Sequence, residues 1–416
     1  MIDIILAEQQ KAALDAIIKW YKAQDKSAFI LNGFAGTGKT TTAKLFPELV
    51  LESEEPGAVV FAAFTGKAAL QLRRKGCENA TTLHRLLYSP MEKDRTRLLE
   101  LSQHLREELV QAPLGDSPKA VSLKNEIHAE RRRVAAPSWQ RKVGHIDEAV
   151  KLIVVDESSM VSMEIYNDLL SLGKPVIFLG DPFQLPPVFG VSPIMQKEPN
   201  FTLTDVHRQA LDSPILRAAT ALRNGEYPSV HDNNEQFKII SSKEASYSDY
   251  GNADQVLCGR NKTRAVLNAK MRKKLVEQGK IALSPLPIAM GDKVVFLRND
   301  HDENIFNGST ALITSVIPAD DGFGGLIIDA KGDEKIYSYD IWPGVIEGLD
   351  ISEAPRRRQI VDFSYALTVH KGQGQEWPHV AVHVEPVGHG QDARRWVYTA
   401  ITRAQDKCVL ISRDVA

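Results

Sequence analysis

Short apolar runs and longer polar stretches alternate between residues 28 and 180. The apolar runs cover residues 28–32, 58–63, 151–155 and 176–180. Each has the length of a strand buried in a parallel sheet, and the stretch after the first run, TTTAKLFPELV, has the pattern of a helix. The alternation predicts an open α/β sheet with ligand sites at the carboxyl ends of its strands.

A second α/β half is predicted to begin near Phe201. Its expected strands lie at 255–258, 364–369, 379–383 and 408–412. Between them, residues 293–339 show several short strand-like runs broken by Gly, Asp and Asn turns, a pattern typical of a small β-barrel. The chain is therefore predicted to have two α/β halves, with a small all-β unit inserted into the second.

The pattern changes between Tyr88 and Gly144. Apolar residues recur there at three- and four-residue spacing, on both sides of the breaker sequence APLGDSP. These positions are Leu98, Leu101, Leu105, Leu109, Leu123, Ile127 and Val134. We interpret the segment as a helical hairpin inserted into the first half. Its far end is basic, with Arg131, Arg132, Arg133, Arg141 and Lys142.

Charge and cysteine content narrow the class of protein. Lys and Arg number 51 against 53 Asp and Glu, so a nucleic-acid partner would need a local basic patch. Residues 257–274 include seven basic and no acidic ones, and they form either such a patch or a solvated helix face. Three separated cysteines fit a reducing compartment and form no metal motif. Without a leader pattern or an apolar stretch of about 18 residues, the chain is expected to be soluble and to have no membrane partner.

The first apolar run leads into GFAGTGKT at residues 33–40, a complete G-x-x-x-x-G-K-[ST] sequence between a strand and a helix. Backbone N–H groups of such a loop wrap phosphates, so ATP is the expected ligand. Lys39 is expected to reach the β- and γ-phosphates, and the Thr40 hydroxyl is expected to bind Mg²⁺. The expected nucleotide-binding residues of the loop are Gly33, Gly36, Thr37, Gly38, Lys39, Thr40 and Thr41.

An acidic pair, Asp156 and Glu157, follows the third apolar run. Asp156 can hold Mg²⁺, and Glu157 can deprotonate the attacking water. Gln184, after the fourth run, is placed to sense the γ-phosphate. Arg208 and Arg403 lie in the second half, so each could reach the γ-phosphate only across a cleft between the halves; the alternative for both is a surface ion pair. The presence of these residues together with Lys39 predicts that the protein hydrolyses ATP.

Segments in sequence order resemble the motifs of superfamily 1B DNA helicases of the RecD/Dda type. They are LAEQQKAAL (6–14, Q motif), GFAGTGKTT (33–41, motif I), AAFTGKAAL (62–70, Ia), TTLHRLL (81–87, Ib), VVDESSM (154–160, II), GDPFQLPPV (180–188, III), LTDVHRQ (203–209, IV), YALTVHKGQGQEW (365–377, V) and VYTAITRAQDK (397–407, VI). The resemblance covers most of the chain, and the motifs together are far more specific than any one alone.

The resemblance implies two RecA-like P-loop domains, with the nucleotide between them and single-stranded DNA across both. It also implies translocation in the 5′→3′ direction. It makes Gln10 the adenine-reading residue and Arg208 and Arg403 arginine fingers. The DNA contacts expected from motif positions are Thr65, His84, Thr368 and His370. Outside such a motif, a lone histidine more often has a structural role.

The resemblance also divides the chain into domains. Domain 1A is expected at 1–87 and 145–200, domain 1B at 88–144, domain 2A at 201–284 and 362–416, and an SH3-like domain 2B at 285–361. Domain 1B is the pin or wedge that splits duplex DNA in the family. In it, Trp139 is either a base-stacking residue or an anchor to the first domain. Domain 2B could contact DNA or a partner protein.

Motif V departs from the family pattern. It reads HKGQGQEW from residue 370, where the family commonly has HKSQG followed by Ser-Glu-aromatic. Gly372 therefore lacks a hydroxyl, which bears on the coupling between the grip on DNA and ATP hydrolysis.

The predicted function is an ATP-dependent DNA helicase that is stimulated by single-stranded DNA and acts at junctions of single and double strands. We expect a cytoplasmic monomer of a bacterial or phage-infected cell, acting in DNA replication, repair or recombination. Single-strand-binding or replisome proteins are candidate partners. Two alternatives are an ATPase that remodels or loads a protein–nucleic-acid complex without unwinding, and an RNA-directed helicase. Stimulation of hydrolysis by DNA, by a protein or by RNA distinguishes the three.

Overall fold

A computed structural model describes most of the chain. The described residues are 6–23, 28–51, 57–90, 96–111, 117–135, 139–142, 146–187, 191–205, 212–282, 287–298, 305, 307–319, 322–329, 334–337, 341–342, 345–346 and 359–413. Arg208 lies outside these ranges, and so do the side chains of Leu98, Val134 and Trp139. No helix within the ranges is long and apolar enough to cross a membrane.

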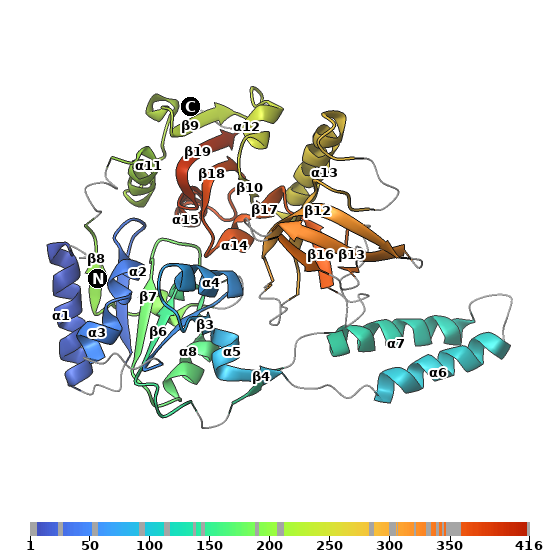
Figure 1. Ribbon diagram of the computed structural model, residues 1–416, viewed down its shortest axis with the longest axis horizontal. Helices are drawn as coiled ribbons and strands as arrows, with labels where there is room; N and C mark the ends of the chain where they lie inside the picture. Colours follow the sequence, from blue (N-terminus) through green and yellow to red (C-terminus); the bar gives the residue numbers. More distant parts are fainter. Residues whose placement is uncertain are drawn as a thin grey trace.

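A six-stranded parallel sheet forms the first half of the molecule (Figure 1). Its strand order is β3-β2-β6-β7-β1-β8. The strands are β1 (Phe29–Gly33), β2 (Val59–Ala63), β3 (Thr81–Thr82), β6 (Leu152–Asp156), β7 (Val176–Gly180) and β8 (Phe201–Leu203). The four apolar runs predicted as strands are confirmed. Because β8 pairs with β1, the first sheet continues beyond the boundary predicted at residue 200.

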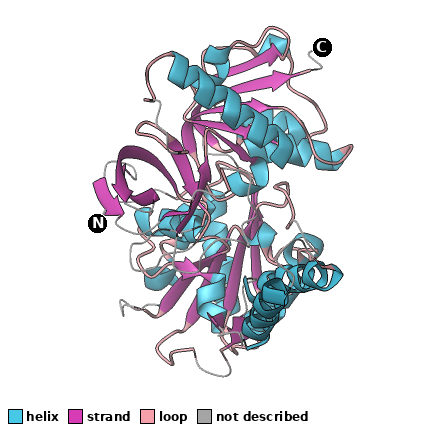
Figure 2. Ribbon diagram, turned by 90° about the vertical axis from the view of Figure 1, so that its right-hand side faces the viewer, coloured by secondary structure: helices cyan, strands magenta, loops and turns pink. Residues whose placement is uncertain are grey.

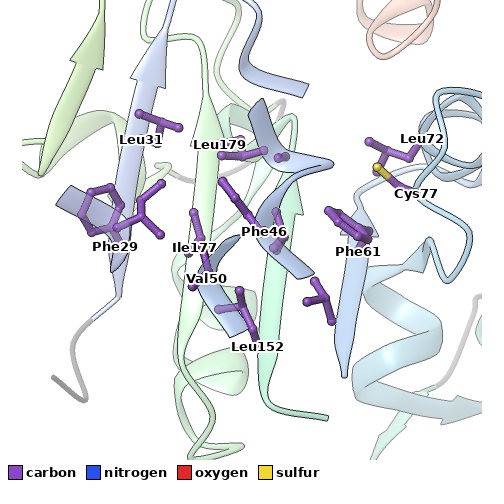
Figure 3. Packing of buried hydrophobic residues seen from close by; sticks show 14 of the residues in the cluster. Phe29, Leu31, Phe46, Val50, Phe61, Leu72, Cys77, Leu152, Ile177 and Leu179 are labelled. Carbon is purple, nitrogen blue, oxygen red and sulfur yellow. The ribbon is translucent and has the colours of Figure 1, made fainter. Parts of the chain in front are cut away.

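Helices cover both faces of this sheet (Figure 2). One face packs against α1 (Glu8–Lys22), α2 (Lys39–Ala43), α3 (Phe46–Leu51) and α4 (Gly66–Arg74). The other packs against α5 (Leu83–Leu87), α8 (Met163–Leu170) and α9 (Pro193–Gln196), and η1 (Ser158–Met160) follows β6. Leu31 and Leu179 lie in the first core with Phe46 (Figure 3), whereas Ile30 and Phe178 face the second. Strands buried on both faces consist mainly of apolar residues, which is why the sequence pattern revealed them.

The second half contains a parallel sheet with the strand order β17-β10-β18-β19-β9. Its strands are β9 (Phe237–Ser241), β10 (Gln255–Cys258), β17 (Ala366–Thr368), β18 (Trp377–His383) and β19 (Ala404–Ser412). Its helices are α11 (Pro214–Arg223), η2 (Val230–Asp232), α12 (Tyr247–Gly251), α13 (Asn261–Glu277), α14 (Val369–Gly372) and α15 (Gln391–Ile401). The four predicted strands are present. β9 was not predicted, because its sequence FKIIS is short and neither alternates regularly nor forms a continuous apolar run.

Between β3 and β6 the chain leaves the first sheet. α6 (Thr96–Gln111) and α7 (Pro118–Ala135) pack side by side and extend away from both halves (Figure 1). Their small core contains Leu101, Leu123 and Ile127, with Leu105 packed against it. At their base, β4 (Tyr88–Pro90) pairs with β5 (Trp139–Arg141) in an antiparallel ribbon that the helical pattern did not predict.

A third, mostly antiparallel sheet lies beside the second half (Figure 1), with the order β14-β13-β12-β11-β16-β15. Its strands are β11 (Lys293–Phe296), β12 (Thr310–Ala319), β13 (Gly322–Asp329), β14 (Glu334–Tyr337), β15 (Ile341–Trp342) and β16 (Gln359–Phe363). β15 also contacts β13, so the sheet curls on itself. The sheet extends beyond the predicted range 293–339, and its likeness to an SH3 barrel stays a prediction.

Candidate nucleotide site and nucleic-acid groove

The P-loop joins the end of β1 to the start of α2. Gly36 and Gly38 have φ angles of 80° and 77°, in the left-handed region that glycine adopts without strain. The Lys39 ammonium donates to the carbonyl oxygens of Gly33 (2.5 Å) and Phe34 (3.0 Å). The loop therefore closes around the lysine that is expected to meet phosphates.

Gln10 supports the P-loop from behind. Its amide nitrogen donates to the carbonyl oxygen of Thr37 at 3.3 Å, and its amide oxygen accepts from Ala7 N–H at 2.9 Å. Thr37 is buried, and its hydroxyl donates to the carbonyl oxygen of Phe34. Gln10 and Thr37 thus hold the loop in shape, and the adenine-reading role of Gln10 stays a prediction.

A hydroxyl and a carboxylate meet beside the loop. Thr40 Oγ1 donates to Asp156 Oδ2 at 3.3 Å, and Glu157 N–H donates to Asp156 Oδ1 at 2.8 Å. Burial raises the pKa of Asp156, and the charge of Glu157 raises it further. A buried carboxylate is costly unless a cation compensates it, and a hydroxyl with a carboxylate is a suitable oxygen donor pair for Mg²⁺. The two residues therefore fit the metal that the sequence predicts.

Glu157, Gln184 and Arg403 meet although they come from three different motifs. Arg403 Nη1 lies 3.5 Å from Glu157 Oε1. The Gln184 amide, oriented to satisfy both neighbours, donates to Glu157 Oε2 at 3.1 Å and accepts from Arg403 Nη2 at 3.2 Å. Glu157 has a φ angle of 51°, and such a conformation costs about 1–3 kcal/mol and is common at functional sites. Arg403 comes from the second half, so the contact spans the two halves.

A pocket of about 600 Å³ lies between the two halves. The predicted residues that line it are Gly36, Gly38, Lys39, Thr40, Thr41, Asp156, Glu157, Gln184 and Arg403. Lys75 of the first half and Glu376 of the second also line it, and their charged groups lie 3.6 Å apart. The structure thus brings together the predicted nucleotide residues except Gln10, Gly33 and Thr37, which shape the loop from behind, and Arg208, which is not described.

Tyr398, which was not predicted, connects the P-loop to motif III. Its hydroxyl donates to Asp181 Oδ2 at 2.6 Å and accepts from Ala35 N–H at 3.0 Å. Burial raises the pKa of Tyr398 well above its usual value and also raises the pKa of Asp181. Next to it, Thr399 Oγ1 accepts from Leu185 N–H at 3.0 Å. Apolar periodicity could not reveal these contacts, because each partner is far away in the sequence.

A second pocket, of about 880 Å³, is formed by both halves and the third sheet. We call it the groove. The residues that line it include Phe64, Thr65, Lys67, His84, Arg85, Tyr88, Lys142, Val295, Leu297, Asn307, His370, Lys371 and Gln375. Basic side chains and aromatic rings therefore occur together, which is the composition of a single-strand binding surface.

The predicted DNA residues have distinct places at the groove. Thr65 and His84 line it, as does His370, whereas Thr368 is buried at the end of β17. The hydroxyls of Thr65 and Thr368 accept from Ala68 N–H (3.1 Å) and Lys371 N–H (3.3 Å), so both threonines cap helices. Burial lowers the pKa of both His84 and His370 below the usual value. The lowered pKa favours the neutral form of both histidines at pH 7.

Aromatic residues that the sequence did not single out surround His84. The ring centroids of Phe64 and Tyr88 lie 5.7 Å and 5.9 Å from that of His84. The Tyr88 hydroxyl donates to Asp168, which also pairs with Arg141 at 3.2 Å. These contacts fix the base of the inserted hairpin to α8, and they use Arg141 as an anchor.

Two of the seven basic residues in the stretch 257–274 have structural roles. Arg272 makes a bidentate pair with buried Asp292 (2.8 and 2.9 Å), and Arg264 pairs with Asp362 at 2.6 Å. Both acidic partners belong to the third sheet or the turn leading into it, so these arginines hold the sheet against α13. A phosphate-facing patch is therefore wrong for these two residues, because their charges are already compensated.

Gly372 lies where a side chain has little room. A Cβ atom there would approach Leu257 Cδ2 to 3.2 Å and the Trp377 ring to 3.6 Å. The hydroxyl that the family commonly carries at this position would thus require a shift of these neighbours. The departure in motif V matches the local packing of this chain.

Two parallel sheets that share a P-loop pocket define a two-domain P-loop protein. The family model described as "AAA domain" matches residues 5–244, more than half of the chain, and a UvrD-like helicase C-terminal domain matches residues 363–411. The chain belongs to the family of the AAA-domain model, and its relatives support the RecD/Dda type of superfamily 1B that the motifs predicted.

Curated relatives agree with this assignment, and a solved structure agrees with the fold. The chain is 28% identical over 429 residues to the ATP-dependent RecD2 DNA helicase of Deinococcus radiodurans, covering 97% of this chain and 48% of that protein. It is 26% identical over 305 residues to the ATP-dependent DNA helicase Dda of Enterobacteria phage T4, covering 66% and 58%. The chain thus spans about half the length of these curated relatives. The Pif1 helicase from Bacteroides in complex with ADP-AlF3 and ssDNA has the same fold, with a TM-score of 0.55, 19% identity and coverage of 100% and 94%.

Proposed function

We propose that the chain is an ATP-dependent DNA helicase whose hydrolysis is stimulated by single-stranded DNA. The observation that carries the proposal is that the nucleotide pocket and the groove both lie between the same two α/β halves. A movement of one half against the other changes both sites at once, which is the requirement for a motor. The relatives named ATP-dependent DNA helicases support this activity.

In the proposed reaction, Lys39 binds the β- and γ-phosphates of ATP, while Thr40 and Asp156 hold Mg²⁺. Bound Mg²⁺ supplies positive charge to the phosphate oxygens. Glu157 takes the proton of the attacking water, and Gln184 orients that water or the γ-phosphate. The contacts of Glu157 with both Gln184 and Arg403 support these roles.

Arg403 is proposed to stabilise the charge that develops on the γ-phosphate. It reaches the pocket from the second half, so the arginine is in place only when the halves are close together. Such an arginine typically contributes about 10³–10⁵-fold to phosphoryl transfer. Arg208 is proposed as a second finger, on its motif position alone.

In the proposed DNA complex, the groove holds the strand by its backbone and by its bases. Lys67, Lys142 and Lys371 supply positive charge for phosphates, which gives binding without sequence preference. Bases can stack on the aromatic rings beside His84, each contributing about 1–3 kcal/mol. Because His84 and His370 are neutral, they act through stacking or hydrogen bonds, together with the hydroxyls of Thr65 and Thr368.

The inserted hairpin is proposed as the wedge of domain 1B, and the third sheet as domain 2B. The ribbon of β4 and β5 anchors the helices beside the groove, because Lys142 follows β5 and lines the groove itself. Duplex DNA that meets this ribbon would be separated as one strand enters the groove. Trp139, in β5, is the proposed stacking residue. We also propose movement in the 5′→3′ direction, and action as a monomer with ATP and Mg²⁺.

Strand displacement on two tailed duplexes tests the proposed function. One duplex carries a 5′ single-stranded tail and the other a 3′ tail, each with Mg²⁺ and ATP, and a Glu157→Gln variant serves as the inactive control. We expect unwinding of the 5′-tailed duplex only. Unwinding from the 3′ tail would contradict the direction. Hydrolysis without unwinding of either duplex would instead favour an ATPase that remodels a complex.

A further inference from the structure

Gln375 contacts both sites with different parts of the same residue. Its side-chain oxygen accepts from the Lys67 ammonium, and its side-chain nitrogen donates to the carbonyl oxygen of Lys371 at 2.9 Å. Its backbone carbonyl oxygen accepts from Arg403 Nη1 at 3.5 Å. Lys67 belongs to α4 in the first half, whereas Gln375 and Arg403 belong to the second. The side chain of Gln375 therefore bridges the halves at the groove, and its backbone touches the nucleotide site.

We propose that Gln375 is the positioning residue that links occupancy of the groove to the placement of Arg403. The inference rests on the proposed function, since it assumes that a strand occupies the groove and that Arg403 serves hydrolysis. It adds a specific pair of contacts, Lys67 with Gln375 and Gln375 with Arg403, through which the coupling passes.

The surroundings hold Gln375 firmly. The residue is 3% exposed. The preceding Gly374 has a φ angle of 70°, and a Cβ atom there would lie 2.9 Å from Ala68 Cβ. The loop therefore packs directly on α4, the helix that carries Lys67. A displacement of Lys67 is transmitted to this loop, because close-packed groups move together rather than independently.

The length of the side chain matters at this position. In the family, motif V commonly has serine where this chain has Gln375, after HKSQG. A serine hydroxyl is attached directly to Cβ, whereas the glutamine amide lies two carbons further out. Glutamine can therefore reach Lys67 across the interface, and serine cannot. This chain thus has a bridge that the common pattern lacks.

The bridge between Gln375 and Lys67 has two states, formed and broken, because a phosphate in the groove can compete with Gln375 for Lys67. Lys67 is one of the residues that line the groove, and its ammonium lies 5.4 Å from the centre of the Trp377 ring. A phosphate in the groove competes with Gln375 for this ammonium, because charge-assisted bonds to phosphate are stronger than bonds to an amide. Release of the side chain frees the loop, and its carbonyl then repositions Arg403. By linkage, if the bound strand changes the affinity for ATP through the placement of Arg403, bound ATP changes the affinity for the strand by the same factor.

The test is Gln375→Ser, measured as ATP hydrolysis against the concentration of oligo-dT. We expect the fold stimulation at saturating DNA to fall by about tenfold, the usual effect of losing one hydrogen bond to a charged group. The DNA concentration for half-maximal stimulation does not rise, since Lys67 remains available to phosphate. Gln359→Ser is the matched control: Gln359, in β16, is also buried, its side-chain nitrogen donates to the Arg298 carbonyl at 3.2 Å, and it lines neither pocket. This control keeps normal stimulation.

A double-mutant cycle with Lys67→Met shows whether Gln375 acts through the lysine. If it does, the double variant loses no more stimulation than the more affected single variant. If the losses of stimulation in the two single variants multiply in the double variant, the inference is overturned. So would normal stimulation in Gln375→Ser, or an equal fall of unstimulated and stimulated rates together with a lower melting temperature. If the unaltered protein shows no stimulation by DNA, the proposed function itself fails.

Discussion

The nucleotide pocket and the groove differ in how their residues are distributed along the chain. About half of the residues that line the pocket come from the contiguous P-loop and from the ends of β6 and β7. The groove is lined by groups of one to four residues from both halves, the inserted hairpin and the third sheet. Both lie between the same two halves, yet local sequence defines the first far better than the second. A binding surface that several units share is thus defined by how the units pack.

The largest expected effect separates the two regions. Lys39→Ala removes the cation that meets the phosphates, so ATP hydrolysis falls by a factor on the order of 10² to 10³. Binding of single-stranded DNA without nucleotide is unchanged, because Lys39 does not line the groove. Phosphate release and fluorescence anisotropy measure the two properties. Full hydrolysis in this variant would refute the assignment of the pocket.

A smaller effect is expected where the two halves touch. Tyr398→Phe removes the hydroxyl that donates to Asp181 Oδ2 and accepts from Ala35 N–H, which costs about 1–3 kcal/mol of stability and lowers the rate of hydrolysis by about tenfold. Tyr365→Phe is the matched control, because its hydroxyl donates to buried Asp292 at 2.7 Å, away from the pocket. We expect similar destabilisation in both variants by chemical denaturation, but normal hydrolysis in Tyr365→Phe. If Tyr398→Phe and Tyr365→Phe lost hydrolysis to the same extent, the role of Tyr398 would be purely structural.

The smallest effect concerns pH and the groove. Burial lowers the pKa of His84 and His370, so the folded protein binds fewer protons at these sites than the unfolded chain. Their contribution to stability is therefore complete above the unfolded pKa of about 6.5 and is lost as the pH falls through the lowered values. Between pH 8 and pH 7 the affinity for single-stranded DNA changes by less than about twofold, since both rings stay neutral. A tenfold increase over this range at constant ionic strength would show charged histidines in the groove.

The predictions that succeeded depended on contiguous residues. The P-loop and the buried strands each form one short segment, and the pattern of that segment defines their structure. The misread features depend on distant partners. Arg264 has the pattern of a solvated or phosphate-facing residue until Asp362, almost one hundred residues later, is placed beside it. Likewise, the contact of Tyr398 with Asp181 joins two motifs that periodicity treats separately.

Short or irregular strands were also difficult to predict from the sequence. The three-residue strands β4 and β5 carry too few positions for a period of two to appear. β8 continues the first sheet although it follows a proline-rich stretch, because pairing with β1, not local pattern, decides its place. The groove was hard to predict for the same reason, since two residues that line it, Tyr88 and Lys142, lie at the ends of the ribbon formed by β4 and β5.

The central claim is that one interface serves both sites, so the nucleotide state must change the grip on DNA. The most direct measurement is the dissociation constant of oligo-dT by anisotropy, with no nucleotide, with ADP and with a non-hydrolysable ATP analogue, each with Mg²⁺. We predict that the constants with ADP and with the ATP analogue differ by about fivefold or more, the lower end of typical coupling between sites. Equal constants in all three states would show that the pocket and the groove are independent, and would contradict the account.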